Sequence, residues 1–229
     1  MKIEFFFDKE RDLKNIWRTC QKSDSYGYDF TKTVSKSILE VCQGKEFGKC
    51  KSDLKKQVVW VHKSPLIEDI VKLRNSSWSK IEKEYFKRLE RITKHKFSLK
   101  KLIPVFMTSV QKCPYNADPK TASFYVNIFG NSFGAMQTCG HELMHIHLHN
   151  SPWWPSTEKE IGYEKTNNLK EALTELLNLE FRDLWVVKDV GYPNHQELRI
   201  YIHKQWLKDK NFKRLTTKCI KWIKKNGIK

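Results

Sequence analysis

The chain has 229 residues, of which 39% are hydrophobic and 13% aromatic, so it can build a packed core and is not a disordered polypeptide. No apolar run approaches the ~20 residues that a membrane-spanning helix needs, so no membrane partner is expected. The net charge of +17 is compatible with nucleic-acid binding, but 35 of the 43 basic residues are Lys and only 8 are Arg, the residue that best recognises phosphates and bases.

The N-terminal segment and the cysteines bear on the cellular compartment. Residues 1–8 contain only three consecutive apolar residues, whereas a secretory signal needs ~7–15, so this segment is predicted to be a short strand. The six cysteines include no C-x-x-C pair, which argues against a cysteine-rich zinc knuckle. We therefore expect free thiols and a cytoplasmic protein.

The first part of the chain is predicted to be mostly helical. Residues 10–20 and 31–43 have the pattern of short amphipathic helices, and 44–51 that of a turn. Residues 57–62 (Gln-Val-Val-Trp-Val-His) are rich in β-branched side chains and are predicted to be a strand. From 66 to 95 apolar residues recur at spacings of three and four, which predicts one long helix.

The pattern changes after this helix. Residues 102–110 and 122–129 are predicted strands, and the two prolines of 113–119 mark a turn between them. Helical periodicity then predominates to the end of the chain, interrupted by a predicted loop at 153–155. The predicted helices are 132–148, 168–187, 194–208 and 212–225.

The segment His141-Glu-Leu-Met-His145 is an H-E-x-x-H motif on the predicted helix 132–148. Residues four apart lie on one face of an α-helix, about 6 Å from each other, so two imidazoles at this spacing can bind one zinc ion. Glu142 lies beside that face and can accept a proton from a water molecule activated by the metal. The apolar residues around the motif indicate a buried helix rather than an exposed one with incidental histidines.

A catalytic zinc site needs a third protein ligand and one open position. His147 lies about 200° around the helix from His145, so it is expected to face away from the metal. His149 lies ~12 Å along the helix axis from His141, which is too far for a shared metal on a straight helix.

Glu171 and Glu175 are better candidates for the third ligand. They are four residues apart, so they share a face of the apolar helix 168–187. Buried carboxylates on such a helix need a metal or a polar partner. One of the two can ligate zinc, and the other can accept the distal N–H of a ligating histidine.

Residues 100–180 resemble the gluzincin metallopeptidases, in which an H-E-x-x-H helix is followed by a second helix that bears a glutamate ligand. The pattern on that second helix is Asn-Glu-small-x-Ser/Thr-acid, and 170–175 (Lys-Glu-Ala-Leu-Thr-Glu) is similar, with Lys in place of Asn. The resemblance implies that Glu171 is the third zinc ligand and that Glu175 is the partner of His141.

Glu164 is the rival for the third ligand. It follows His145 with 18 residues between them, a spacing that some aminopeptidases of the gluzincin clan use. Its surroundings, Gly-Tyr-Glu-Lys-Thr-Asn, are not predicted to be helical, so we rank it behind Glu171.

The resemblance also implies an α+β, zincin-like fold, with a small sheet, an active-site helix, a helical N-terminal region and a helical C-terminal lobe. A single domain spanning 1–229 would then have two lobes, 1–150 and 151–229. In the clan, the strand before the motif helix is an edge strand that binds extended peptide, a role that 123–129 fits. The clan also supplies a Tyr or His that stabilises the oxyanion, for which Tyr163 and His195 are the candidates.

Three functions remain open on the sequence alone. The first is a zinc-dependent hydrolase of peptide or protein substrates, with Glu142 as general base. The second is a DNA-associated protease that resembles the SprT-like family, because 203–229 contain ten Lys or Arg against Asp209 alone. SprT-like chains usually take their third ligand from a later His, so Glu171 favours the first function. The third is a non-catalytic, metal-binding regulatory or interaction module that lacks the oxyanion partner.

Overall fold

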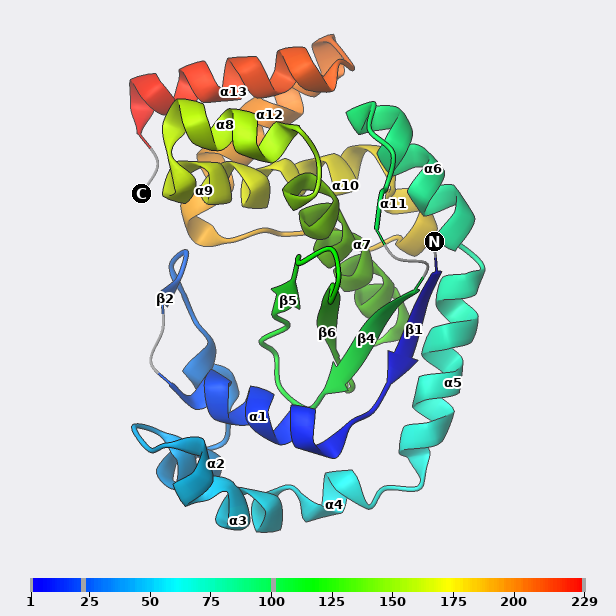
Figure 1. The fold of residues 1–229 in the computed structure, drawn as a ribbon, viewed down its shortest axis with the longest axis vertical. Helices are drawn as coiled ribbons and strands as arrows, with labels where there is room; N and C mark the ends of the chain where they lie inside the picture. Colours follow the sequence, from blue (N-terminus) through cyan, green and yellow to red (C-terminus); the bar gives the residue numbers. More distant parts are fainter. Residues whose placement is uncertain (1, 22–23, 100–101, 228–229) are drawn as a thin grey trace.

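A small mixed sheet packed among many helices makes this an α+β fold (Figure 1). The structure is a computed structural model that describes residues 2–21, 24–99 and 102–227. Within that part of the chain the main sheet has four strands, in the order β1-β4-β6-β5. Their bounds are β1 Lys2–Phe6, β4 Leu102–Thr108, β5 Tyr115–Asn116 and β6 Ser123–Asn127. A separate hairpin consists of β2 (Asp24–Ser25) and β3 (Tyr28–Asp29).

The central strands are parallel and bury one face. β1 pairs with β4 and β4 pairs with β6, both in parallel, and β5 pairs with β6 antiparallel. Every second side chain points into the core, as Phe5 and its sheet partner Val105 show, and Val105 in turn lies beside Phe124. The three predicted strands at the N-terminus, 102–110 and 122–129 are confirmed, with slightly shorter bounds.

The prediction that 123–129 form the edge strand is wrong. β6 lies between β4 and β5, and Tyr125 N also donates to the Pro114 carbonyl at 3.0 Å, so its outer side is covered. The edge strand on this side of the sheet is β5, in the segment where two prolines predicted only a turn. Two residues of strand are too few to produce an alternating pattern in the sequence.

The helices of the first part run around the sheet, with α5 alongside β1 (Figure 1). Their bounds are α1 Lys9–Cys20, the 3-10 helix η1 Phe30–Thr33, α2 Lys36–Cys42, α3 Phe47–Gln57, α4 Val59–His62, α5 Leu66–Ser79 and α6 Glu82–Thr93. The predicted helix 10–20 is confirmed. The second predicted helix starts later than expected, at Lys36, and the predicted turn 44–51 includes the beginning of α3.

Two predictions in this part are wrong. Residues 57–62 are helical, because the buried Val58, Val61 and His62 follow helical spacing while Trp60 between them is 68% exposed. The long helix 66–95 breaks between α5 and α6, where Glu82 accepts hydrogen bonds from the backbone of β1 and from the Trp78 indole. Neither proline nor glycine marks this break, so the sequence contained no local signal for it.

From residue 132 onward the chain is helical: α7 runs alongside the sheet, and α8, α9, α12 and α13 lie above it in the view of Figure 1. Their bounds are α7 Ser132–His149, α8 Trp153–Ile161, α9 Tyr163–Leu173, α10 Glu175–Glu180, α11 Arg182–Trp185, the 3-10 helix η2 Pro193–His195, α12 Gln196–Lys208 and α13 Phe212–Asn226. The predicted helices 132–148, 194–208 and 212–225 are confirmed.

Two further predictions need correction. The predicted loop 153–155 is the first turn of α8, where Pro155 removes no intrahelical hydrogen bond. The predicted helix 168–187 begins earlier, at Tyr163, and is divided into α9, α10 and α11. Gly162, with φ of +82°, makes the turn between α8 and α9, which brings the rival ligand Glu164 into a helix.

The main hydrophobic core extends from β1 to α13, and a smaller core lies among α1, α2 and α3. The main core includes residues on both sides of position 150, and the division into two lobes there stays a prediction. All six cysteines are free, as predicted. In the described ranges, no helix has the length and apolar character needed to cross a membrane.

Candidate metal centre

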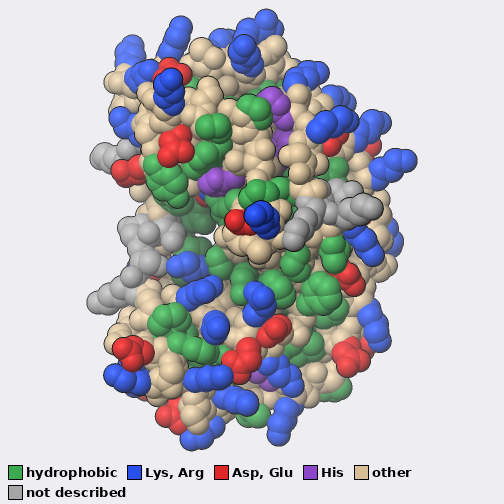
Figure 2. All heavy atoms as spheres, viewed as in Figure 1, with side chains coloured by type: hydrophobic (Ala, Val, Ile, Leu, Met, Phe, Trp, Pro, Cys, Tyr) green, Lys and Arg blue, Asp and Glu red, His purple; other side chains and the backbone are tan. Residues whose placement is uncertain are grey.

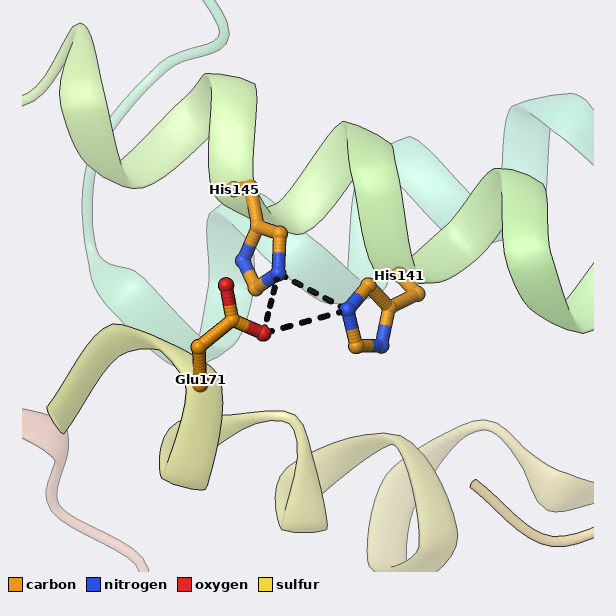
Figure 3. A group of neighbouring side chains, drawn as sticks. All are labelled: His141, His145 and Glu171. Atoms are coloured by element: carbon orange, nitrogen blue, oxygen red, sulfur yellow. Dashed lines mark hydrogen bonds and ion pairs between the residues drawn. The ribbon is translucent and has the colours of Figure 1, made fainter. Parts of the chain in front are cut away.

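The motif helix α7 is fixed in the core by contacts at Gly140, immediately before the motif. A Cβ at Gly140 would come within 2.4 Å of the Trp185 ring, so the close packing of this ring requires glycine. The Tyr85 hydroxyl donates a hydrogen bond to the Gly140 carbonyl at 2.6 Å. Both contacts fix the orientation of α7 about its own axis, with His141 and His145 directed toward α9 (Figure 3).

The side chains of His141, His145 and Glu171 meet between α7 and α9 (Figure 3). His145 Nε2 lies 2.8 Å from His141 Nε2 and 3.0 Å from Glu171 Oε2, and the third side of this triangle, His141 Nε2 to Glu171 Oε2, is 3.5 Å. The predicted convergence of the three residues is confirmed, and the group can hold a metal ion.

The chemistry of the three atoms fits a bound cation. His141 Nδ1 lies 2.6 Å from Asp189 Oδ2 and donates to it in the neutral ring, so Nε2 presents a lone pair to the triad. The Glu171 carboxylate is only an acceptor, so a positive charge among the three atoms, either a proton on an imidazole or a metal ion, offsets the repulsion between their electron pairs. Ligand atoms of a tetrahedral zinc site with bonds of about 2.0–2.1 Å lie about 3.3 Å apart. The distances between the three candidate ligand atoms, 2.8 to 3.5 Å, are close to that separation.

Asp189, which the sequence analysis missed, orients His141. It lies in the loop after α11, is 5% exposed, and is held by the Arg199 guanidinium at 3.1 Å and the Gln137 amide at 2.7 Å. Burial opposes its ionisation, but the neighbouring imidazole outweighs burial and lowers the pKa of Asp189. Burial likewise opposes protonation of His141. The attraction of the Asp189 carboxylate is stronger than this effect, so the pKa of His141 is raised well above its usual range.

The role predicted for Glu175 as the partner of His141 is wrong. Its carboxylate instead contacts the His203 imidazole at 2.9 Å, the Arg199 guanidinium at 2.9 Å and the Asn178 amide at 2.9 Å. The chain ends α9 at Leu173 and starts α10 at Glu175, and this interruption breaks the common face that the spacing predicted. Glu175 therefore acts on the centre only through Arg199, which also holds Asp189.

Removing Asp189 should weaken the metal centre without removing a ligand. We expect Asp189→Ala to lower zinc affinity about 10- to 100-fold, as is usual when a ligating histidine loses its hydrogen-bond partner. Glu175→Ala should have a smaller effect, because its carboxylate does not contact His141. Competition with a chromogenic chelator measures both affinities. A larger loss in the Glu175 variant would contradict the assignment of Asp189.

Glu142 faces the same centre from α7. Its side chain is 7% exposed, and its Oε2 is buried without a hydrogen-bond partner among the residues that the structure describes. Burial raises the pKa of Glu142 to about 8. A cation at the neighbouring triad would favour the ionised carboxylate, which is the form that accepts a proton.

The centre opens into a cleft that is bordered by η1, by the segment 111–115, by α7 and by the loop after α11. Two adjoining hollows of about 110 and 220 Å³ share the side chains of His141 and Glu142, and Phe30, Cys113 and Tyr192 also line both. Figure 2 shows this face of the molecule recessed between its upper and lower parts, with Lys and Arg side chains along the lower margin. A substrate can therefore approach the triad and Glu142 from solvent.

Neither residue predicted to stabilise an oxyanion lines this cleft. The Tyr163 side chain is 61% exposed and packs against Trp154, with ring centroids 5.9 Å apart. His195 is fully buried, and its Nε2 is engaged with the Asn168 side chain at 2.7 Å. Tyr192, three residues before His195, does line the cleft. Its loop position, Gly-Tyr-Pro, gave no spacing that would have singled it out.

The other histidines of α7 and the rival ligand lie apart from the triad. His147 Nε2 contacts the Thr93 hydroxyl at 2.8 Å, and His149 Nε2 contacts the Tyr115 hydroxyl at 2.8 Å. Glu164 is exposed in the first turn of α9. As expected, His147, His149 and Glu164 do not belong to the group that can hold a metal ion.

Comparison of the chain with protein-family models, with curated proteins and with solved structures finds no match.

Proposed function

We propose that the chain is a zinc-dependent peptide-bond hydrolase of the gluzincin type, with a zincin-like fold. The observation that carries the proposal is the convergence of His141, His145 and Glu171 at a cleft, with the buried carboxylate of Glu142 beside them. The relation to gluzincins rests on the motif helix α7 and on the glutamate-bearing helix α9.

Zinc is the metal that this donor set suits best. Two imidazole nitrogens and one carboxylate oxygen leave one position open, as in catalytic zinc sites, whereas Mg²⁺ and Ca²⁺ prefer sites made of oxygen ligands. When bound, zinc polarises a carbonyl oxygen and makes water a better nucleophile near neutral pH.

The chain's own residues would move the proton. Glu142 would accept it from the attacking water and pass it to the leaving amine, since its carboxylate borders the cleft and its Oε2 has no hydrogen-bond partner among the described residues. Asp189 would keep His141 in the tautomer that ligates through Nε2.

The edge strand β5 is the proposed docking site for the peptide. It ends the described sheet on the side of the cleft, and Tyr115 and the preceding Pro114 line the hollow that contains the triad. An extended peptide can add to such an edge through main-chain hydrogen bonds. A substrate held there would pass its backbone across the metal centre, which favours unfolded protein or flexible segments as substrates.

Tyr192 is proposed to stabilise the oxyanion, because it lines both hollows beside the triad. We expect Tyr192→Phe to keep its zinc and to lower kcat about 10²- to 10³-fold, the usual cost of removing one oxyanion donor. The matched change Tyr163→Phe should leave kcat near wild type, since that side chain is exposed on α9. Steady-state kinetics on one peptide compares the three chains, and a larger loss in the Tyr163 variant would overturn the assignment.

A protease assay tests the proposed function. The chain, with its metal content verified, is incubated with denatured casein, and fragments are expected to accumulate. A chelator should stop the cleavage, and added zinc should restore it. Intact casein in the presence of metal-loaded chain would instead favour a non-catalytic metal-binding module.

A further inference from the structure

Lys170 is a buried cation beside the metal centre. Its side chain is 1% exposed, although it belongs to α9 next to the ligand Glu171. A buried ammonium group is strongly unfavourable unless it is paired and hydrogen-bonded, so a lysine at this position needs a compensating role. It is also the residue that departs from the gluzincin pattern, where Asn precedes the glutamate.

The two oxygens of Glu171 have different partners. Oε1 lies 2.9 Å from the Lys170 ammonium, while Oε2 faces the Nε2 atoms of His145 and His141. Figure 3 shows the contacts from both imidazoles ending on one oxygen of Glu171, which is Oε2. With Oε1 held by a charged hydrogen bond, only Oε2 is presented to a metal.

Lys170 also connects this ligand to the edge strand. Its ammonium donates to the Tyr115 hydroxyl and lies 4.7 Å from the centre of the same ring. Because an ammonium group only donates, the Tyr115 oxygen accepts from it and is free to donate to His149 Nε2 at 2.8 Å. His149 in turn stacks on Trp154 with ring centroids 3.6 Å apart. One continuous network therefore joins α9, β5, α7 and α8.

We propose that Lys170 is a positioning residue that holds Oε1 of Glu171, so that the carboxylate offers a single oxygen to the metal and one coordination position stays open. This inference rests on the proposed zinc centre. The alternative is that Lys170 only fills space and balances charge in the core. The two roles differ in what they predict for the coordination of the metal when the hydrogen bond to Oε1 is removed.

Cobalt substitution tests the proposal, because the visible absorption of Co²⁺ is intense in four-coordinate sites and weak in sites of higher coordination number. Lys170→Met and Lys170→Gln are matched in size, but only glutamine keeps an N–H donor for Oε1. We expect Lys170→Met to lose the intense absorption, as Glu171 becomes free to bind through both oxygens. Lys170→Gln should keep the wild-type spectrum. Lys165→Met, at an exposed position of the same helix, should match wild type.

Zinc affinity provides a second measurement. We expect Lys170→Met to bind zinc about 10- to 100-fold more weakly than wild type, as other losses of ligand support do. Unchanged absorption and affinity in Lys170→Met would overturn the proposal. If Lys170→Met does not fold, Lys170→Gln is measured instead. Loss of the intense absorption in Lys170→Gln would also overturn the proposal. A wild-type chain that binds neither metal would instead contradict the zinc centre itself.

Discussion

Replacing Glu142 with Gln is expected to lower kcat for peptide hydrolysis about 10²- to 10⁴-fold while the chain keeps its zinc. The amide has nearly the same size and shape as the carboxylate, but it cannot accept a proton from water. The two histidines and Glu171, which form the group that can hold a metal ion, are untouched. Steady-state kinetics and elemental analysis of the same preparation measure the two properties together.

The effect should be specific to this carboxylate. Glu197→Gln, which makes the same chemical change at an exposed position of α12, should leave both kcat and zinc content near wild type. Turnover near wild type in the Glu142 variant would show that another group takes the proton. Loss of zinc in that variant would show that Glu142 supports the metal rather than the reaction.

The second large effect concerns the third ligand. We expect Glu171→Ala to lose most of its zinc and with it all measurable hydrolysis, because two histidines alone bind zinc far more weakly than three ligands. Glu171 is 6% exposed and its Oε2 lies within 3.0 Å of His145 Nε2. The buried residues of α9 pack against α7, and such packing is what holds a ligand atom in place.

Glu164→Ala is the control for this experiment. Glu164 lies on the same helix, seven residues before Glu171 and therefore ~10 Å away along the axis, and its side chain is exposed. The variant should keep its zinc. Elemental analysis of both purified variants distinguishes the ligands, and the reverse result, with zinc lost only in the Glu164 variant, would contradict the assignment.

The sequence predicted the inner group of the site because helical spacing is a local property. His141 and His145 are four residues apart on one helix, and their joint orientation follows from that spacing alone. Glu171 was found because it lies on an apolar helix, where a carboxylate needs a partner, and because its local pattern resembles that of gluzincins. The α+β class followed from the resemblance to gluzincins, and the predicted strands 102–110 and 122–129 do lie in the sheet, as β4 and β6.

The groups around that inner set could not be found in this way. Asp189 and Tyr192 lie in one irregular loop, and only the path of that loop back over α7 brings them to the site. Glu175 was misassigned because its spacing from Glu171 assumes a continuous helix, whereas the chain interrupts it at Thr174. Long-range packing determines these positions, and such packing produces no periodic pattern in a single sequence.

The zinc dependence of hydrolysis tests the proposed function most directly. The chain is stripped with a chelator, zinc is added back in known amounts, and the rate of cleavage of an unfolded protein is measured at each step. We expect no cleavage without metal and a rate that rises in proportion to zinc, reaching a plateau when about one equivalent occupies the three-ligand site. A chain that takes up this zinc through His141, His145 and Glu171 and still cleaves no peptide bond would contradict the proposal that it is a hydrolase.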